Sequence, residues 1–220
     1  MSEEGRQRLR EEDLAFFGAI AASLSHQINN VFTIVNELNG LVEDLLYASE
    51  GGRPIPPERL KAVAEKIGRN VGRGTEYVRL LNRFAHSADH PEADVDLCEV
   101  LRLFEALSAR FVELKQATLT LGLPPHAVPV RTRPFTLLHA LHVCLQALLE
   151  SQGGRACLRV TARLEGGRPA LRLEGPPSLK GGGGLERRLD LLGRLADELG
   201  ARALFDGEGE TARFEITLPA

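Results

Sequence analysis

Apolar residues recur at alternating spacings of three and four along the first third of the chain. The stripe begins at Leu14 and continues without a break to Leu45. Such a heptad predicts a long amphipathic helix that packs against other helices. The glycines and prolines of ASEGGRPIPP interrupt the pattern, which resumes from Leu60 to Ala85 in a second helix expected to start at Pro57.

Two long helices joined by a short turn form an antiparallel hairpin. One hairpin alone cannot bury two apolar stripes of this length, because each helix has a single neighbour. A second copy of the chain packing against the first would complete a four-helix bundle. The pattern therefore predicts a homodimer.

The pattern changes after the polar stretch HSADHPEADVD, which contains a proline and is interpreted as a linker. Helical periodicity then alternates with short stretches of strand-like alternation and glycine-containing turns, which predicts a two-layer α/β sandwich. The chain is thus divided into a helical domain, residues 1–90, and an α/β domain, residues 91–220. The helices are expected at 97–114, 135–150 and 185–199, and the strands at 117–123, 128–130, 157–164, 170–175, 201–205 and 212–218.

Composition narrows the classes of partner. The chain has 43% hydrophobic residues and a formal net charge of -3 with both signs interspersed, so it has neither the basic patch that nucleic acid needs nor a polybasic segment for a membrane. Its charged start and the lack of an apolar run of about 20 residues indicate a cytoplasmic protein. Three cysteines without CxxC spacing, Cys98, Cys144 and Cys157, are expected to be small buried residues.

One polar strip on the first helix contains a histidine. In SLSHQINNVF, placing Ile28 at heptad position a puts His26 at position f, which faces water. Asn30 and Thr33 lie on the same outer strip, with Gln27 beside it. An exposed imidazole is largely neutral at pH 7 and can carry a phosphoryl group on a ring nitrogen, with the Asn30 amide as a hydrogen-bond donor to that group. The alternative is a solvated helix face without chemistry.

Other chemical candidates have simpler interpretations. The run GGGG at residues 181–184 lacks the Lys-Ser/Thr of a phosphate-binding loop, and it is interpreted as a flexible loop that caps a helix. His139 and His142 have the spacing of a zinc pair but no acidic or thiol neighbour in the sequence, so packing is favoured. His86 and His90 fall in the expected linker and are interpreted as solvated.

The stretch SLSHQINNVFTIVNEL resembles the phosphoacceptor helix of sensor histidine kinases. The order of elements after residue 97, the glycine segment before a helix and the closing FEITLP resemble the ATP-binding domain of the same family. The resemblance implies an α + α/β chain, in which a dimeric four-helix bundle precedes a two-layer sandwich without the family's lid. It implies that His26 is the phosphoacceptor, with Asn30 and Gln27 beside it. A response-regulator receiver domain approaching His26 would contact Phe32, Thr33 and Asn36.

The nucleotide site departs from the family pattern. Gln146 stands where a helix asparagine holds magnesium, and Leu173 stands where an aspartate reads adenine. Glu174 would replace that aspartate only if the strand register shifted by one, and only residues 178–180 separate GPP from the glycine run, which leaves no lid. The remnant positions are His142, Gln146, Leu173, Glu174, Gly175, Gly182 and Gly184.

The family's acidic residue after the phosphoacceptor is also replaced, by Gln27, whose amide cannot accept a proton. The pattern resembles histidine phosphotransferases derived from kinases, which exchange a phosphoryl group with response-regulator aspartates. No cofactor is then expected on this chain, and Mg²⁺ is expected on the partner receiver domain. Two alternatives stay open: a divergent kinase that binds ATP through Glu174 and Gln146, and a scaffold or phosphatase in which His26 is incidental.

Overall fold

The computed structural model describes residues 3–52, 54–150, 156–176, 183–207 and 211–219. They form two compact units, Gly18–Asn82 and Met1–Phe17 with Arg83–Ala220. The unit that holds the α/β sandwich therefore also takes in the start of the first helix and the end of the second, whereas the sequence analysis places one boundary at residue 90. The roles assigned to the two domains stay predictions.

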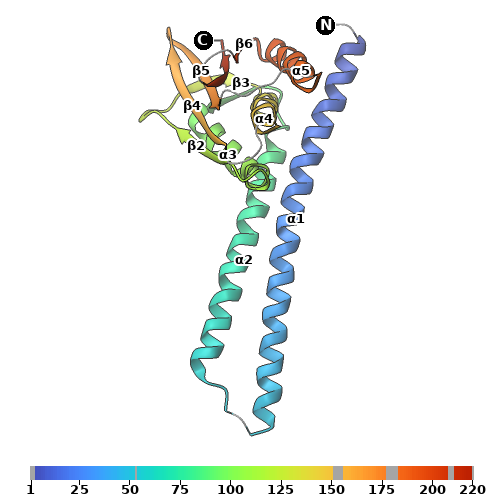
Figure 1. The fold of residues 1–220 in the computed structure, drawn as a ribbon, viewed down its shortest axis with the longest axis vertical. Coiled ribbons are helices and arrows are strands. Elements are labelled where there is room, and N and C mark those ends of the chain that lie inside the picture. The colour runs from blue at the N-terminus through green and yellow to red at the C-terminus, as the bar shows by residue number, and fades with distance from the viewer. Residues whose placement is uncertain (1–2, 53, 151–155, 177–182, 208–210, 220) are drawn as a thin grey trace. The chain divides into compact units, whose positions relative to one another are not determined.

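The helices α1 (Glu3–Glu50) and α2 (Pro57–His86) form a hairpin (Figure 1), and the unit Gly18–Asn82 contains most of both helices and the turn between them. The hairpin, and the start of its second helix at Pro57, are as predicted. Leu24, Val31 and Val63 are buried within it. A Cβ placed on Gly74 would lie 3.2 Å from Cγ1 of Val31, so the two helices come close at this point because glycine has no side chain.

The start of α1 differs from the predicted stripe. The helix begins at Glu3, and Phe16 is buried while Leu14 is 71% exposed. Residues 3–17 belong to the α/β unit rather than to the hairpin unit, so their buried face is set by a different neighbour. The heptad predicted helix-on-helix packing along the whole length and placed Leu14 in the wrong environment.

The sandwich contains a five-stranded sheet with strand order β2-β4-β5-β7-β6, in which β2 and β4 are parallel and the other pairs antiparallel. Helices α3, α4 and α5 cover one face (Figure 1). The strands are β2 (Thr118–Gly122), β4 (Cys157–Glu165), β5 (Arg168–Gly175), β6 (Arg202–Asp206) and β7 (Ala212–Thr217), and the helices are α3 (Leu97–Leu114), α4 (Pro134–Glu150) and α5 (Gly183–Leu199). The predicted α + α/β class is confirmed.

The predicted linker contains a strand. β1 (Ala93–Asp96) pairs antiparallel with β3 (Pro129–Thr132) in a separate two-stranded sheet. Asp96 then caps α3, because its Oδ1 accepts hydrogen bonds from the amides of Cys98 at 3.0 Å and Val128 at 2.9 Å. Burial by itself would raise the pKa of Asp96, but these backbone donors outweigh it and lower that pKa. The capping carboxylate explains why a polar segment is ordered here.

Strand alternation separates two faces of the large sheet. A Cβ on Gly175 would lie 3.3 Å from Cδ2 of Leu148, so alternate residues of β5 face α4 and the intervening ones face away. The β4–β5 turn uses Gly166 and Gly167, both with positive φ.

The cysteine prediction is correct for two of the three residues. Cys98 and Cys144 are buried, but Cys157 is exposed, so the expectation is wrong for Cys157. Cys157 lies at the start of β4, where the strand alternation turns its side chain away from the helices. Across the described part of the chain, no helix combines the length and apolar character that crossing a bilayer would require.

Candidate functional site

His26 lies on an exposed face of α1. Two residues before it, Leu24 is 1% exposed, and five residues after it, Val31 is 4% exposed. The helical repeat of 3.6 residues turns His26 away from this buried line, as the heptad predicts. The imidazole is therefore accessible to a protein that approaches α1 from solvent.

Asn30 is hydrogen-bonded to His26 one helical turn away. The amide nitrogen Nδ2 of Asn30 lies 3.3 Å from Nδ1 of His26 and donates to it, so the neutral ring carries its proton on Nε2 in this arrangement. Turning the amide by 180° would place Oδ1 as an acceptor for a proton on Nδ1 and free the lone pair on Nε2. The Asn30 amide can therefore hydrogen-bond Nδ1 of either neutral tautomer.

The other predicted residues of the strip lie at different positions around the helix. Gln27 is half-buried, and Thr33 and Asn36 are exposed. The Thr33 hydroxyl donates to the carbonyl oxygen of Asn29 at 3.1 Å, which fixes its rotamer. Phe32 is 62% exposed, but it borders an apolar groove rather than continuing the polar strip.

The apolar groove of the hairpin has a volume of about 290 Å³ and is formed by both helices. It is lined by Ile28, Val31, Phe32, Val35, Val71, Gly74, Thr75 and Val78. Several of these side chains are strongly exposed in a single chain, with Val71 at 52% and Val78 at 45%. A continuous apolar surface of this kind is typical of a face that is covered by another helix.

Two residues of α4, His142 and Gln146, stand where the resemblance places asparagines, one of which holds the metal. His142 packs against the ring of Phe111, with ring centroids 5.1 Å apart, and its Nε2 lies 3.4 Å from Nε2 of Gln146. Burial first, and then the charges of His139 and Arg188, lower the pKa of His142 to about 3, so the ring is neutral at pH 7. Mg²⁺ prefers oxygen ligands in octahedral geometry, and this histidine–amide pair does not fit it.

The end of β5 is similarly unsuited to reading adenine. Leu173 is 1% exposed on the helix-covered face, where its backbone pairs with Val160 and Phe214. An alkyl side chain cannot accept a hydrogen bond from the adenine amino group. Gly175 is packed against Leu158, since a Cβ there would lie 2.7 Å from Cδ2 of that leucine.

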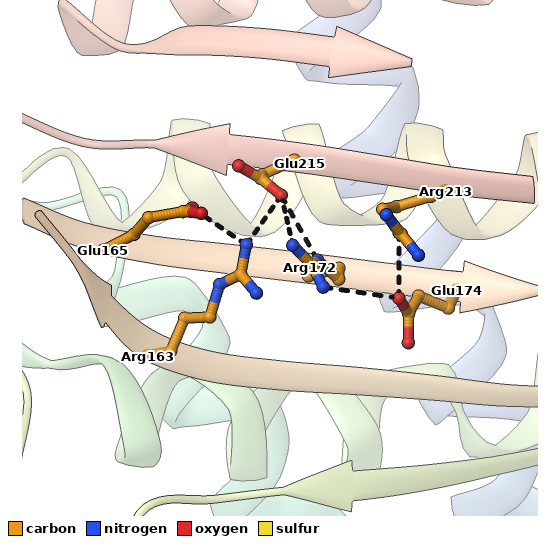
Figure 2. A network of polar contacts seen from close by, with 6 residues as sticks. All are labelled: Arg163, Glu165, Arg172, Glu174, Arg213 and Glu215. Carbon is orange, nitrogen blue, oxygen red and sulfur yellow. Dashed lines mark hydrogen bonds and ion pairs between the residues drawn. The ribbon is translucent and has the colours of Figure 1, made fainter. Parts of the chain in front are cut away.

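Glu174 points to the opposite face of the sheet and belongs to a network of ion pairs (Figure 2). Its Oε1 accepts from Nε of Arg213 at 2.9 Å and lies 3.7 Å from Arg172. Arg172 and Arg163 both donate to Glu215, at 2.9 and 2.8 Å. The carboxylate of Glu174 therefore faces away from α4 and is paired with arginines.

An ion pair joins α4 to α5. Nη2 of Arg188 lies 2.5 Å from the carboxylate of Glu150, and Nη1 of Arg188 donates to the carbonyl oxygen of Gly184 at 3.3 Å. Gly184 is part of α5, so the second half of the glycine run is helical rather than a loop. Two positions named in the sequence analysis lie outside the described residues. They are Gly182 and residues 178–180, the short segment that was predicted to replace the family's lid.

The sequence did not reveal that the start of α1 contacts the two histidines of α4. His139 is 3% exposed, and its Nδ1 lies 2.7 Å from the carboxylate of Asp13, which is 126 residues away in the chain. Phe16 stacks on the same imidazole. The packing role predicted for His139 is confirmed, and the signal that could have found its partner is the line of Leu9, Asp13 and Phe16 on one face of α1.

Comparison with known proteins gives a likeness in structure. No family model and no curated protein matches the chain. The catalytic domain of the histidine kinase ThkA, in a nucleotide-free form, matches with a TM-score of 0.51 and 13% sequence identity, over 59% of this chain and 96% of the ThkA chain. A second nucleotide-free form gives a TM-score of 0.50 and 14% identity, over 59% and 98%. The α/β unit therefore has the fold of a histidine kinase ATP-binding domain.

Proposed function

We propose that this chain is a histidine phosphotransferase of two-component signalling, which accepts a phosphoryl group on His26 and exchanges it with aspartates of response regulators. The observation that supports it is an accessible imidazole, with a hydrogen-bonding amide one turn away, in a chain whose kinase-like unit carries Leu173 and His142 at the nucleotide positions. Phosphoryl transfer depends mainly on positioning and electrostatics, so the protein need only present the ring.

The transfer itself requires few groups from this chain. The step uses the tautomer with its proton on Nδ1, in which the Asn30 amide is turned so that its Oδ1 accepts from Nδ1–H. The lone pair on Nε2 of His26 then attacks the phosphorus of the receiver's aspartyl phosphate, a P–N bond forms, and the P–O bond to the aspartate breaks. The aspartate leaves as a carboxylate and the imidazole becomes a phosphorylated cation. Its Nδ1–H is retained and donates to Oδ1 of Asn30. The reverse sequence delivers the group to a second receiver, whose own pocket would hold Mg²⁺.

The receiver would dock along α1 beside His26. Thr33 and Asn36 are exposed on the same helix and are proposed contacts. Phe32 is proposed as a contact at the edge of this surface, between the polar strip and the apolar groove.

A homodimer is proposed through the apolar groove. Covering Val71, Val78 and their neighbours with the same face of a second hairpin would complete a four-helix bundle and remove apolar surface from water. The polar strip with His26 would stay on the outside of such a bundle, because it lies off the buried line of α1.

The geometry favours this role over an ATP-dependent kinase. The kinase alternative needs Glu174 to read adenine and Gln146 to hold the metal. Glu174 is paired with Arg213 on the far face of the sheet, and Gln146 is hydrogen-bonded to the half-buried His142. Both groups have other partners.

The test is transfer of radiolabel from receiver domains. Receiver domains of response regulators from the source organism are phosphorylated with labelled acetyl phosphate and mixed with the full chain. Acid-labile label is expected on the wild type and on His90→Ala, a matched variant of another exposed histidine, and its loss is expected in His26→Ala. Direct labelling by Mg²⁺-ATP without a receiver would establish the kinase instead. Label that persists in His26→Ala, or transfer from no receiver, would refute the proposal.

A further inference from the structure

The start of α1 packs on α4 through residues that no nucleotide or receiver role explains. Leu9, Asp13 and Phe16 lie at spacings of four and three, which places them on one face of the helix. Leu9 is 1% exposed and Phe16 is 5% exposed, whereas Leu14 on another face is 71% exposed. The buried face of this segment is therefore well defined.

Phe16 is enclosed by aromatic rings. Its ring lies parallel to the imidazole of His139, with centroids 4.6 Å apart and an interplanar angle of 2°. It also lies 5.4 Å from Phe135, 5.5 Å from Phe84 and 5.1 Å from His142. Aromatic contacts of this geometry add to the apolar area that they bury, so Phe16 is the main anchor of the segment.

Asp13 adds a directional contact to this anchor. Its carboxylate accepts a hydrogen bond from Nδ1–H of His139 at 2.7 Å, and the imidazole side chain is only 4% exposed. Removing the carboxylate would leave a buried donor without an acceptor, which is costly in a site closed to water. The pair fixes both the register of α1 on α4 and the plane of the ring on which Phe16 stacks.

The covered surface of α4 includes a remnant position of the nucleotide site. His142 stands where the family has an asparagine near its metal, and here its ring lies between Phe16 and Phe111. The ring centroids are 5.1 Å apart in both contacts, so aromatic side chains cover part of this imidazole.

We infer that residues 9–16 are an internal docking segment that covers the His139–His142 face of α4 within the α/β unit. The segment thereby covers the part of α4 in which the resemblance places the metal-binding residues. The inference rests on the proposed function for this consequence alone; the docking is a structural claim that can be tested without phosphoryl transfer.

Hydrogen exchange of the full chain, followed by mass spectrometry of peptides, tests the docking. In the wild type, amides within residues 3–17 and within α4 should both be protected. Phe16→Ala should lower the protection of both segments together by roughly tenfold or more, since the two surfaces lose one shared contact. Leu14→Ala is the matched control in the same segment, and it should leave α4 unchanged.

A milder variant guards against general unfolding. Asp13→Asn keeps the size of the side chain but weakens the contact with His139, and it should raise exchange in residues 3–17 and in α4 while β4 and β5 stay protected. Docking is refuted if residues 3–17 exchange like a free helix in the wild type, or if both variants leave α4 unchanged. Label transfer to His26, measured on the same samples, reports separately on the proposed function.

Discussion

Gly175 offers a direct test of whether the remnant nucleotide positions now serve packing. A Cβ at this residue would lie 2.7 Å from Cδ2 of Leu158 and 3.3 Å from Cδ2 of Leu148, and both leucines are 1% exposed. Neither side chain can turn into free space, because the interior around them is close-packed. Gly175→Ala is therefore expected to destabilise the α/β unit by about 1–3 kcal/mol, the usual cost of overpacking a core.

The matched control is Gly193→Ala in α5. Apart from its chain neighbours and the adjacent backbone of α5, no heavy atom of the described residues lies within 4 Å of a Cβ placed there, and the residue is helical and exposed. Because alanine is the better helix former, this change should stabilise the unit by about 1 kcal/mol. The two glycine substitutions thus have opposite expected signs within one unit.

Hydrogen exchange in β4 and β5 is the appropriate measurement for these variants. The chain has no tryptophan, and both tyrosines, Tyr47 and Tyr77, lie in the hairpin unit, so intrinsic fluorescence reports on the hairpin rather than on the sheet. Strand protection should fall in Gly175→Ala and rise in Gly193→Ala, with tyrosine fluorescence unchanged in both. A Gly175→Ala protein as stable as the wild type would refute the packing argument.

Three further changes test the ion-pair network, the histidine strip and the groove. Burial would raise the pKa of Glu215, but its hydrogen bond from Arg172 and the nearby arginine charges outweigh burial and lower that pKa. Its stabilisation is therefore present at pH values above the ordinary pKa of a glutamate and is lost as the pH falls through the lower pKa of the folded state. Glu215→Gln should therefore cost roughly 1–3 kcal/mol in urea unfolding at pH 7 and much less at pH 3, and an equal cost at both pH values would contradict the assignment. Asn30→Leu cannot hydrogen-bond the imidazole and should slow label transfer to His26 by roughly tenfold or more, whereas Asn30→Asp can accept from Nδ1–H and should retain transfer. Equal transfer rates for Asn30→Leu and the wild type would exclude a role for the amide. Val78→Asp places a charge in the groove and should halve the mass measured by light scattering. Thr33→Asp on the outer strip should leave that mass unchanged. An unaltered mass in Val78→Asp would exclude the groove as the dimer face.

Local patterns were enough to predict most of the elements. Apolar periodicity predicts the hairpin and the helix Leu97–Leu114. Pro57 and Asp96 predict where α2 and α3 begin, because such residues affect only the backbone a few positions away. The exposure of His26 also follows from the heptad, because the buried line through Leu24 and Val31 fixes the orientation of the whole turn.

The same periodicity failed where a segment packs against something distant in the chain. Leu14 was expected to be buried and Phe16 was not singled out, because the heptad assumes that α1 pairs with α2 along its whole length. Residues 3–17 instead pack within the α/β unit, against an α4 that begins at Pro134. Similarly, β1 was hidden in a polar linker, since a four-residue strand is stabilised by its partner β3 and not by its own composition.

The sequence by itself determined the types of element, their order and the residues available to them: an imidazole on an outer strip, and a leucine and a glutamine where the resemblance places an aspartate and an asparagine. Only the tertiary structure decided which side chains contact one another across the fold. Glu174 faces the side of the sheet opposite α4 because successive residues of β5 alternate between its two faces. His139 contacts Asp13 because folding brings residues 126 positions apart to hydrogen-bonding distance. Such contacts depend on the packing of whole surfaces, which no local spacing encodes.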